Sequence, residues 1–261
     1  MKIDYNYHAH TDLCGHASGT PEEYVLKAIQ GRITHMGFSD HCPLRLEDGY
    51  EANFRVPTQK AREYIAEIRA LKEKYKSKID LHVGFEMEYY PSLFDSMLQY
   101  ARDIGAQYLI LGQHYLDAND ERKQMQLHCI QPTTDEEKLK TYVSSVVSAI
   151  KIGAFTYVAH PDIFQFTGNV QRYQQEMRKI CEASKAYDIP LEINCLGIRD
   201  KRCYPNSAFW EMAGQVQCPV TCGFDAHDIN AAYDQPSLAQ VKALIEKYDL
   251  NYIGKPSIKL L

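Results

Sequence analysis

The chain has 261 residues, of which 45% are hydrophobic, 24% charged and 11% aromatic. This composition is typical of a globular protein and excludes a disordered chain or a collagen-like repeat. The 29 basic and 34 acidic side chains give a formal net charge of -5, which does not favour binding to nucleic acid or to an anionic membrane. We expect one domain spanning 1–261, because α/β barrels of this size fold as a single unit.

No apolar run is long enough for a membrane helix, and the first residues lack the apolar core of a signal peptide. The sequence therefore favours a cytoplasmic location. The eight cysteines are scattered and contain no Cys-x-x-Cys pair, which argues against both a disulfide framework and a zinc ribbon.

Short β-rich runs alternate with longer amphipathic stretches, the pattern of βα units around a parallel sheet. The capping residues Thr20 and Glu23, with Pro21 between them, predict the start of the first helix. Two irregular stretches, 42–57 and 115–133, are long enough to have a function. We predict seven strands, or eight with the last, at 2–8, 33–39, 79–86, 107–113, 154–159, 190–195, 219–224 and 251–254. We predict helices near 21–31, 58–76, 91–104, 134–152, 171–187, 205–215 and 236–248.

Most of the ten histidines lie at or just after the carboxyl end of a predicted strand. In a parallel βα barrel these ends converge on the face that carries the active site. His8 and His10 are two residues apart, as are Asp225 and His227, so each pair points to one side of an extended chain. The candidate metal ligands are His8, His10, His16, His41, Glu86, His114, His160, Asp225 and His227.

These imidazoles and carboxylates form a mixed nitrogen and oxygen donor set that suits zinc, manganese or iron. Nine ligands exceed the roughly four to six that one ion takes. If Glu86 bridges two ions, the set predicts three divalent ions with open positions for water and substrate. Such a site carries a charge of about +4, which favours an anionic substrate such as a phosphate.

Six segments of the chain, in order over residues 8–227, resemble the polymerase and histidinol phosphatase (PHP) family. They are HAHTDLCGHA, FSDH, GFEMEY, GQH, AHPD and GFDAH. The resemblance implies a distorted TIM-like (β/α)7 barrel with its metal site at the C-terminal ends of the strands, acting as a metal-dependent phosphoesterase. It also implies one ion on His8, His10, Glu86 and Asp225, a second on Glu86, His114 and His160, and a third on His16, His41 and His227.

The segment LEINCLGIRDKRCYPN, 191–206, resembles the histidinol-phosphatase branch of this family. That likeness implies that Arg199 contacts the substrate phosphate, with Arg55 as a second candidate for the same contact. The implied reaction is hydrolysis of L-histidinol phosphate to L-histidinol and phosphate in histidine biosynthesis, by in-line attack of a metal-bridging hydroxide. The leaving group would receive its proton from Asp225 or from a second metal-bound water. The implied partner is a small phosphorylated substrate, and the oligomeric state is left open.

Other functions compete with this one. A phosphotyrosine phosphatase or an exonuclease of the same family would keep the fold, although the charge balance disfavours the exonuclease. A metal-dependent amide hydrolase or deaminase would not need His16, Glu86 or the Asp225 and His227 pair. A metal-binding module without turnover is disfavoured by the complete ligand set.

Several other residues near the candidate site are not expected to bind metal. We expect Asp40 to orient a histidine rather than to bind metal. Glu192 and Asn194 either bond a metal-bound water or satisfy each other. His128 is interpreted as an exposed loop residue outside the site, and the cysteines near strand ends as inert packing. His35 and His82 lie near strand starts and so away from the site.

Overall fold

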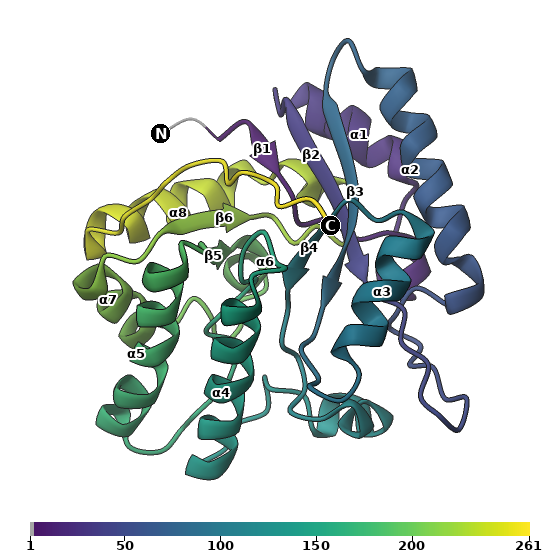
Figure 1. Ribbon diagram of the computed structural model, residues 1–261. Helices are drawn as coiled ribbons and strands as arrows, with labels where there is room; N and C mark the ends of the chain where they lie inside the picture. The colour runs from purple at the N-terminus through teal and green to yellow at the C-terminus, as the bar shows by residue number, and fades with distance from the viewer. Residues whose placement is uncertain (1–2) are drawn as a thin grey trace.

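The computed structural model describes residues 3–261 and shows an α/β fold with a curled parallel sheet (Figure 1). Its strands are β1 (Tyr5–Asn6), β2 (His35–His41), β3 (Asp80–Met87), β4 (Tyr108–Leu111), β5 (Leu191–Asn194) and β6 (Val220–Gly223). Its α-helices are α1 (Pro21–Gln30), α2 (Ala61–Tyr75), α3 (Phe94–Ile104), α4 (Glu136–Ile152), α5 (Val170–Tyr187), α6 (Cys195–Arg199), α7 (Ser207–Val216) and α8 (Gln235–Tyr248). Short 3-10 helices cover Asp12–Cys14, Thr58–Lys60, Ala118–Gln126 and Asn230–Tyr233.

The strands pair in parallel and in chain order. β1, β2, β3 and β4 form one sheet, and β5 and β6 form a second pair. In the first sheet His41 is the register partner of Glu86, which in turn faces Ile110 on β4. This register brings the carboxyl ends of neighbouring strands to one edge of the sheet.

The longer α-helices lie outside the curled sheet (Figure 1), and their buried faces follow helical spacing. In α3 the buried side chains are Phe94, Met97, Ala101 and Ile104, which lie three or four residues apart on one face. The helix α1 begins as expected, because Thr20 accepts a hydrogen bond from the Glu23 amide and Glu23 accepts one from the Thr20 amide. None of the described helices is both long and apolar enough to cross a membrane.

Two predicted strands are reduced to bridges in the structure, and one short helix was not predicted. The run 154–159 forms only isolated bridges, through Val158 to Leu111 and Leu191, and the extended chain stops at His160, whose φ is 30°. The run 251–254 likewise contributes a single bridge. After β5 the short helix α6 was not expected, and it begins because the Asn194 side chain accepts a hydrogen bond from the Gly197 amide.

Gly84 in β3 leaves no room for a side chain. A Cβ there would lie 2.1 Å from the backbone oxygen of Tyr108, its register partner on β4. Because a backbone atom cannot yield cheaply, we expect Gly84→Ala to lower the free energy of unfolding by about 1–3 kcal/mol. Urea denaturation measures this, with Glu182→Ala on the exposed face of α5 as the control. A Gly84→Ala protein no less stable than that control would contradict the prediction.

Candidate metal centre and active site

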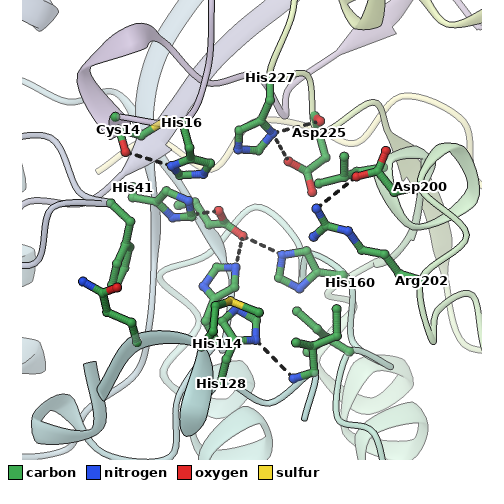
Figure 2. Close-up of a pocket in the computed structure, with 18 of the residues that line it drawn as sticks. Cys14, His16, His41, His114, His128, His160, Asp200, Arg202, Asp225 and His227 are labelled. Carbon is green, nitrogen blue, oxygen red and sulfur yellow. Dashed lines mark hydrogen bonds and ion pairs between the residues drawn. The ribbon is translucent and has the colours of Figure 1, made fainter. Parts of the chain in front are cut away.

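The nine predicted ligands lie together at the carboxyl ends of the strands. His41 ends β2 and Glu86 lies near the end of β3, while the others follow β1, β4, β6 or the 154–159 segment. His16 reaches the same place from the turn after the 3-10 helix Asp12–Cys14. Figure 2 shows the labelled members of the set turned toward a common centre, namely His16, His41, His114, His160, Asp225 and His227.

The Glu86 carboxylate lies in the middle of this cluster and is almost completely buried. Its Oε1 lies 2.8 Å from His160 Nε2 and 3.5 Å from His114 Nε2. Its Oε2 lies 3.2 Å from His41 Nδ1. Both carboxylate oxygens therefore face imidazole nitrogens, as a bridging ligand requires.

Two further groups of donor atoms are equally compact. In each, the ligand atoms all lie within 4.8 Å of one another. The first group, which is fully buried, consists of His8, His10 and Asp225. The second group, which is partly exposed to solvent, consists of His16, His41 and His227.

The hydrogen bonds around these histidines leave their inner nitrogens free. His8 Nδ1 lies 2.9 Å from Glu192 Oε1, and His114 Nδ1 lies 2.8 Å from Glu88 Oε1. Meanwhile the buried Nε2 atoms of His8 and His10 and the Oδ1 atom of Asp225 have no hydrogen-bond partner. Histidines that bind metals have this arrangement, in which the outer nitrogen donates to a carboxylate and the inner one faces the ion. The residues present therefore fit divalent metal ions.

Two glycines make room for the buried carboxylates. A Cβ on Gly112 would lie 2.0 Å from Glu86 Oε1, and one on Gly223 would lie 1.8 Å from Glu192 Oε1. Any larger residue would push these carboxylates away from the histidines. The glycines of the Gly-Gln-His and Gly-Phe-Asp segments therefore contribute to the site by leaving room for these carboxylates.

The surroundings shift the pKa values of the candidate ligands in different directions. Burial alone would raise the pKa of Glu86 and of Asp225, but the surrounding imidazoles hold both pKa values well below the usual range. Burial lowers the pKa of His8 and His10, yet nearby carboxylates, Asp225 above all, raise both well above 6.5. Burial and the charge of His10 instead lower the pKa of His227 to about 4.

Asp40, Glu192 and Asn194 each form a hydrogen bond with a candidate ligand. Asp40 lies 3.4 Å from His10 Nδ1 and accepts a hydrogen bond from the His41 amide at 2.8 Å. This is the geometry expected of a carboxylate that orients a histidine. The Asn194 side-chain amide donates to both Glu192 at 2.8 Å and Asp225 at 3.0 Å. Of the two alternatives for Glu192 and Asn194, the structure therefore contains the mutual hydrogen bond.

The expectation that residues 225–227 are extended is wrong. Asp225 adopts a left-handed conformation with φ 47°, so the chain turns there. The turn brings His227 Nδ1 within 3.2 Å of Asp225 Oδ1 and directs both side chains to the cluster. A left-handed non-glycine residue is strained, and such strain is concentrated at functional sites.

The cluster opens into a cavity of about 770 Å³. Seven of the nine candidate ligands line it, whereas His8 and His10 are fully buried and do not. The opposite wall comes from the two irregular stretches and from the segment around α6. Its side chains include Phe54, Tyr115, Met125, His128, Ile130, Leu196, Arg199 and Arg202.

Arg199 and Arg202 both line this cavity but differ in their partners. Arg199 ends α6 instead of lying on a loop, and its Nη1 lies 2.9 Å from Asp234 Oδ2. Arg202 donates to Asp200 and Tyr204, and Figure 2 shows its guanidinium pointing inward toward Asp225. Arg202 was not among the residues predicted from the sequence for the site. Its only signal was its place in the basic run beside Arg199.

The expected contact of Arg55 with substrate does not fit the structure. Arg55 is buried outside the cavity lining, where its Nη2 lies 2.6 Å from both Glu88 and Glu121. Its Nη1 donates to the Cys42 carbonyl at 2.7 Å. Two carboxylates thus neutralise this guanidinium, and one of them, Glu88, bonds the candidate ligand His114. Glu88 follows Glu86 by two residues, a spacing that could have revealed it.

The prediction that His128 lies outside the site is wrong, because His128 lines the cavity. Its Nδ1 accepts a hydrogen bond from the Ile130 amide at 3.1 Å. Its ring lies 5.5 Å from that of His114, centroid to centroid. Burial and the charges of His114 and His160 lower the pKa of His128 to about 2, so its imidazole is neutral. No sequence signal indicated this position, because the loop folds back onto the cluster.

Comparison with known proteins agrees with this geometry. The family model for the PHP domain matches residues 6–195, which is most of the chain. This chain belongs to the PHP family. A probable histidinol-phosphatase of Deinococcus radiodurans is 27% identical over 84% of this chain and 85% of its own. The histidinol-phosphatase of Bacillus subtilis is 24% identical over 87% of this chain and 96% of its own.

Solved structures of PHP relatives share the fold. A putative histidinol phosphatase of Listeria monocytogenes superposes with a TM-score of 0.73 at 21% identity, covering 90% of this chain and 99% of its own. A histidinol phosphate phosphatase of Lactococcus lactis, solved with zinc, L-histidinol and phosphate, gives a TM-score of 0.72 at 19% identity over the full length of both chains. The PHP match ends before Asp225 and His227, which the structure nevertheless brings to the same cluster.

The raised pKa values of His8 and His10 predict that metal uptake releases protons. The raised pKa values favour the protonated form of both imidazoles, and only neutral imidazole binds a metal. Zinc affinity should therefore rise with pH between 6 and 8. Calorimetric titration of the chelator-stripped protein with zinc, in two buffers of different ionisation enthalpy, measures the protons released. Identical heats in both buffers would refute the prediction, and His8→Gln should release fewer protons than the wild type.

Proposed function

We propose that this protein is a metal-dependent phosphomonoesterase that hydrolyses L-histidinol phosphate to L-histidinol and phosphate. The observation that carries the proposal is the convergence of seven histidines and two carboxylates at the end of a cavity of about 770 Å³. A cavity of this size accommodates a small substrate. The names of the similar proteins from Deinococcus radiodurans and Bacillus subtilis support the choice of substrate.

We further propose that the centre holds three divalent ions. Glu86 would bridge two of them, because both of its oxygens face imidazole nitrogens. Ions bound there supply positive charge to the phosphoryl oxygens and activate water for attack on phosphorus. The three proposed ligand sets are His8, His10, Glu86 and Asp225; Glu86, His114 and His160; and His16, His41 and His227.

The two arginines of the cavity wall would bind the phosphoryl group. A guanidinium offers two parallel donors to two phosphate oxygens, which a lysine cannot match. Arg202 points into the cavity, while Arg199 is held by Asp234 at its rim. Asp225 belongs with the ligands rather than with the proton donors, because its pKa is held well below its usual range. We therefore assign the leaving group's proton to water.

We also infer that the curled sheet forms a distorted seven-stranded barrel within one domain over 1–261. Parallel bridges from Val158 to Leu111 and to Leu191 support this inference on one side of the sheet. A bridge between Ala9 and Ala226 supports it on the other, where the β1 and β6 segments meet. The seventh strand would be the segment 154–159.

A turnover assay with a panel of phosphomonoesters tests the proposed function. The panel contains L-histidinol phosphate, tyrosine phosphate, phenyl phosphate and a dinucleotide, with metal content measured on the same preparation. We expect the highest kcat/KM for L-histidinol phosphate. A metal-loaded protein that prefers tyrosine phosphate or the dinucleotide would overturn the choice of substrate while keeping the family.

The bridging role of Glu86 predicts the metal content. Protein purified without chelator should contain more than one divalent ion per chain, up to three. Glu86→Ala should disturb two of them, since its carboxylate faces two groups of histidines. Elemental analysis measures both quantities, with Glu63→Ala on the exposed face of α2 as the control. One ion or none in the wild type would contradict the three-ion centre.

The arginines predict a loss of catalysis without a loss of metal. We expect Arg199→Ala and Arg202→Ala each to lower kcat/KM by roughly 10²–10³, the scale of one lost donor to a charged transition state. Arg199→Lys should recover only part of this. Steady-state kinetics and metal analysis measure the effects, with Arg178→Ala on α5 as the control. An Arg199→Ala protein within about threefold of the wild type would assign Arg199 to its bonds with Asp234 and with the Phe224 and Asp225 carbonyls.

A further inference from the structure

The hydrogen bonding of His128 fixes what this side chain offers to the cavity. Its Nδ1 accepts the Ile130 N–H at 3.1 Å, so Nδ1 carries no proton. In a neutral imidazole the proton then lies on Nε2. Nε2 has no hydrogen-bond partner among the described residues 3–261. His128 therefore presents a fixed, uncharged and unused N–H donor in a cavity whose other basic groups are arginines and candidate ligands.

The neighbours of His128 place this donor at the edge of the metal centre. Its ring lies between those of His114, at 5.5 Å, and Tyr115, at 5.1 Å in an edge-to-face arrangement. Tyr115 in turn stacks on Phe54 at 5.6 Å. A continuous run of rings thus leads from a candidate ligand to the loop 42–57. The adjoining cavity wall is apolar, with Met125, Ile130, Ile163 and Leu196.

We propose that His128 is a specificity-determining residue that donates its Nε2–H to an acceptor atom on the leaving group of the substrate. A phosphoryl group held at the metal centre leaves the rest of the substrate beside the apolar wall, where His128 supplies a polar contact. The leaving group that fits is a flat ring carrying an unprotonated nitrogen, as in the imidazole of histidinol. This inference rests on the proposed function and assigns one further contact to it.

The chemistry of the contact predicts which kinetic constant it changes. The leaving-group ring is bound equally in the ground state and in the transition state, because it lies away from the reacting phosphorus. Losing such a contact raises KM and leaves kcat unchanged. A contact with the phosphoryl group would instead strengthen in the transition state, and its loss would lower kcat for every substrate.

Two variants distinguish the role of the Nε2–H donor from that of Nδ1, which holds the loop through the Ile130 N–H. His128→Asn keeps an acceptor near Nδ1 for the Ile130 N–H but has no donor near Nε2. His128→Gln places an amide donor near Nε2 but loses the Nδ1 acceptor. We expect His128→Asn to raise KM for L-histidinol phosphate about tenfold to a hundredfold, with kcat within threefold of the wild type. His128→Gln should keep KM closer to the wild-type value, and both should leave phenyl phosphate hydrolysis unchanged.

Calorimetric binding of L-histidinol to the metal-loaded protein provides a readout that does not depend on turnover, and it should weaken by the same factor in His128→Asn. His35→Gln, at the start of β2 and far from the cavity, serves as the control, and thermal unfolding checks that each variant folds. Equal losses of kcat on L-histidinol phosphate and phenyl phosphate would overturn the proposal. So would a loss in His128→Gln without one in His128→Asn, which would assign His128 to the loop alone.

Failure of the proposed function would be recognised separately. If the wild type does not hydrolyse L-histidinol phosphate, the proposed function is wrong, and the ring-containing phosphomonoester with the highest kcat/KM takes its place in the same comparison. The inference then requires that His128→Asn raise KM for that substrate relative to phenyl phosphate. Equal KM changes for that substrate and for phenyl phosphate would overturn the inference.

Discussion

The buried carboxylate of Glu86 is the group on which the arrangement of the site depends. It lies near the end of a strand in the interior of the four-stranded sheet, and it is only 1% exposed. Burying a carboxylate is costly unless positive or donor groups surround it. Five imidazoles within 3.6 Å meet this need, and they come from β2 and from the ends of β1, β4 and the 154–159 segment. Those imidazoles belong to His8, His10, His41, His114 and His160.

The same charges link proton binding to metal binding at the candidate site. Nearby carboxylates, Asp225 above all, raise the pKa values of His8 and His10. A divalent ion held at the inner nitrogens of these residues would take the place of protons. Their outer nitrogens already lie beside Glu192 and Asp40.

The sequence predicted the positions of the candidate ligands well because they are encoded locally. A histidine after a β-rich run lies at a strand end, and parallel strands bring their ends together. Arg55 was misassigned because its partners, Glu88 and Glu121, are 33 and 66 residues away along the chain. His128 was misassigned because its loop folds back in a way that no local pattern encodes. The helix α6 was missed because five residues are too few to show periodicity.

The two irregular stretches, 42–57 and 115–133, supply part of the cavity wall next to the candidate ligands. They are joined by Arg55, which lies in 42–57 and bonds Glu121 in 115–133 as well as Glu88 beside His114. Tyr90 also donates to Glu121, at 2.7 Å, so the buried guanidinium and its carboxylates are held from several sides. A fully satisfied buried network is rigid, because breaking one bond leaves an unpaired charge. The loops that carry Phe54 and His128 are therefore fixed relative to His114. Under the proposed function, the strand ends would bind the phosphoryl group, and the loops, anchored through Arg55, would decide which leaving group fits.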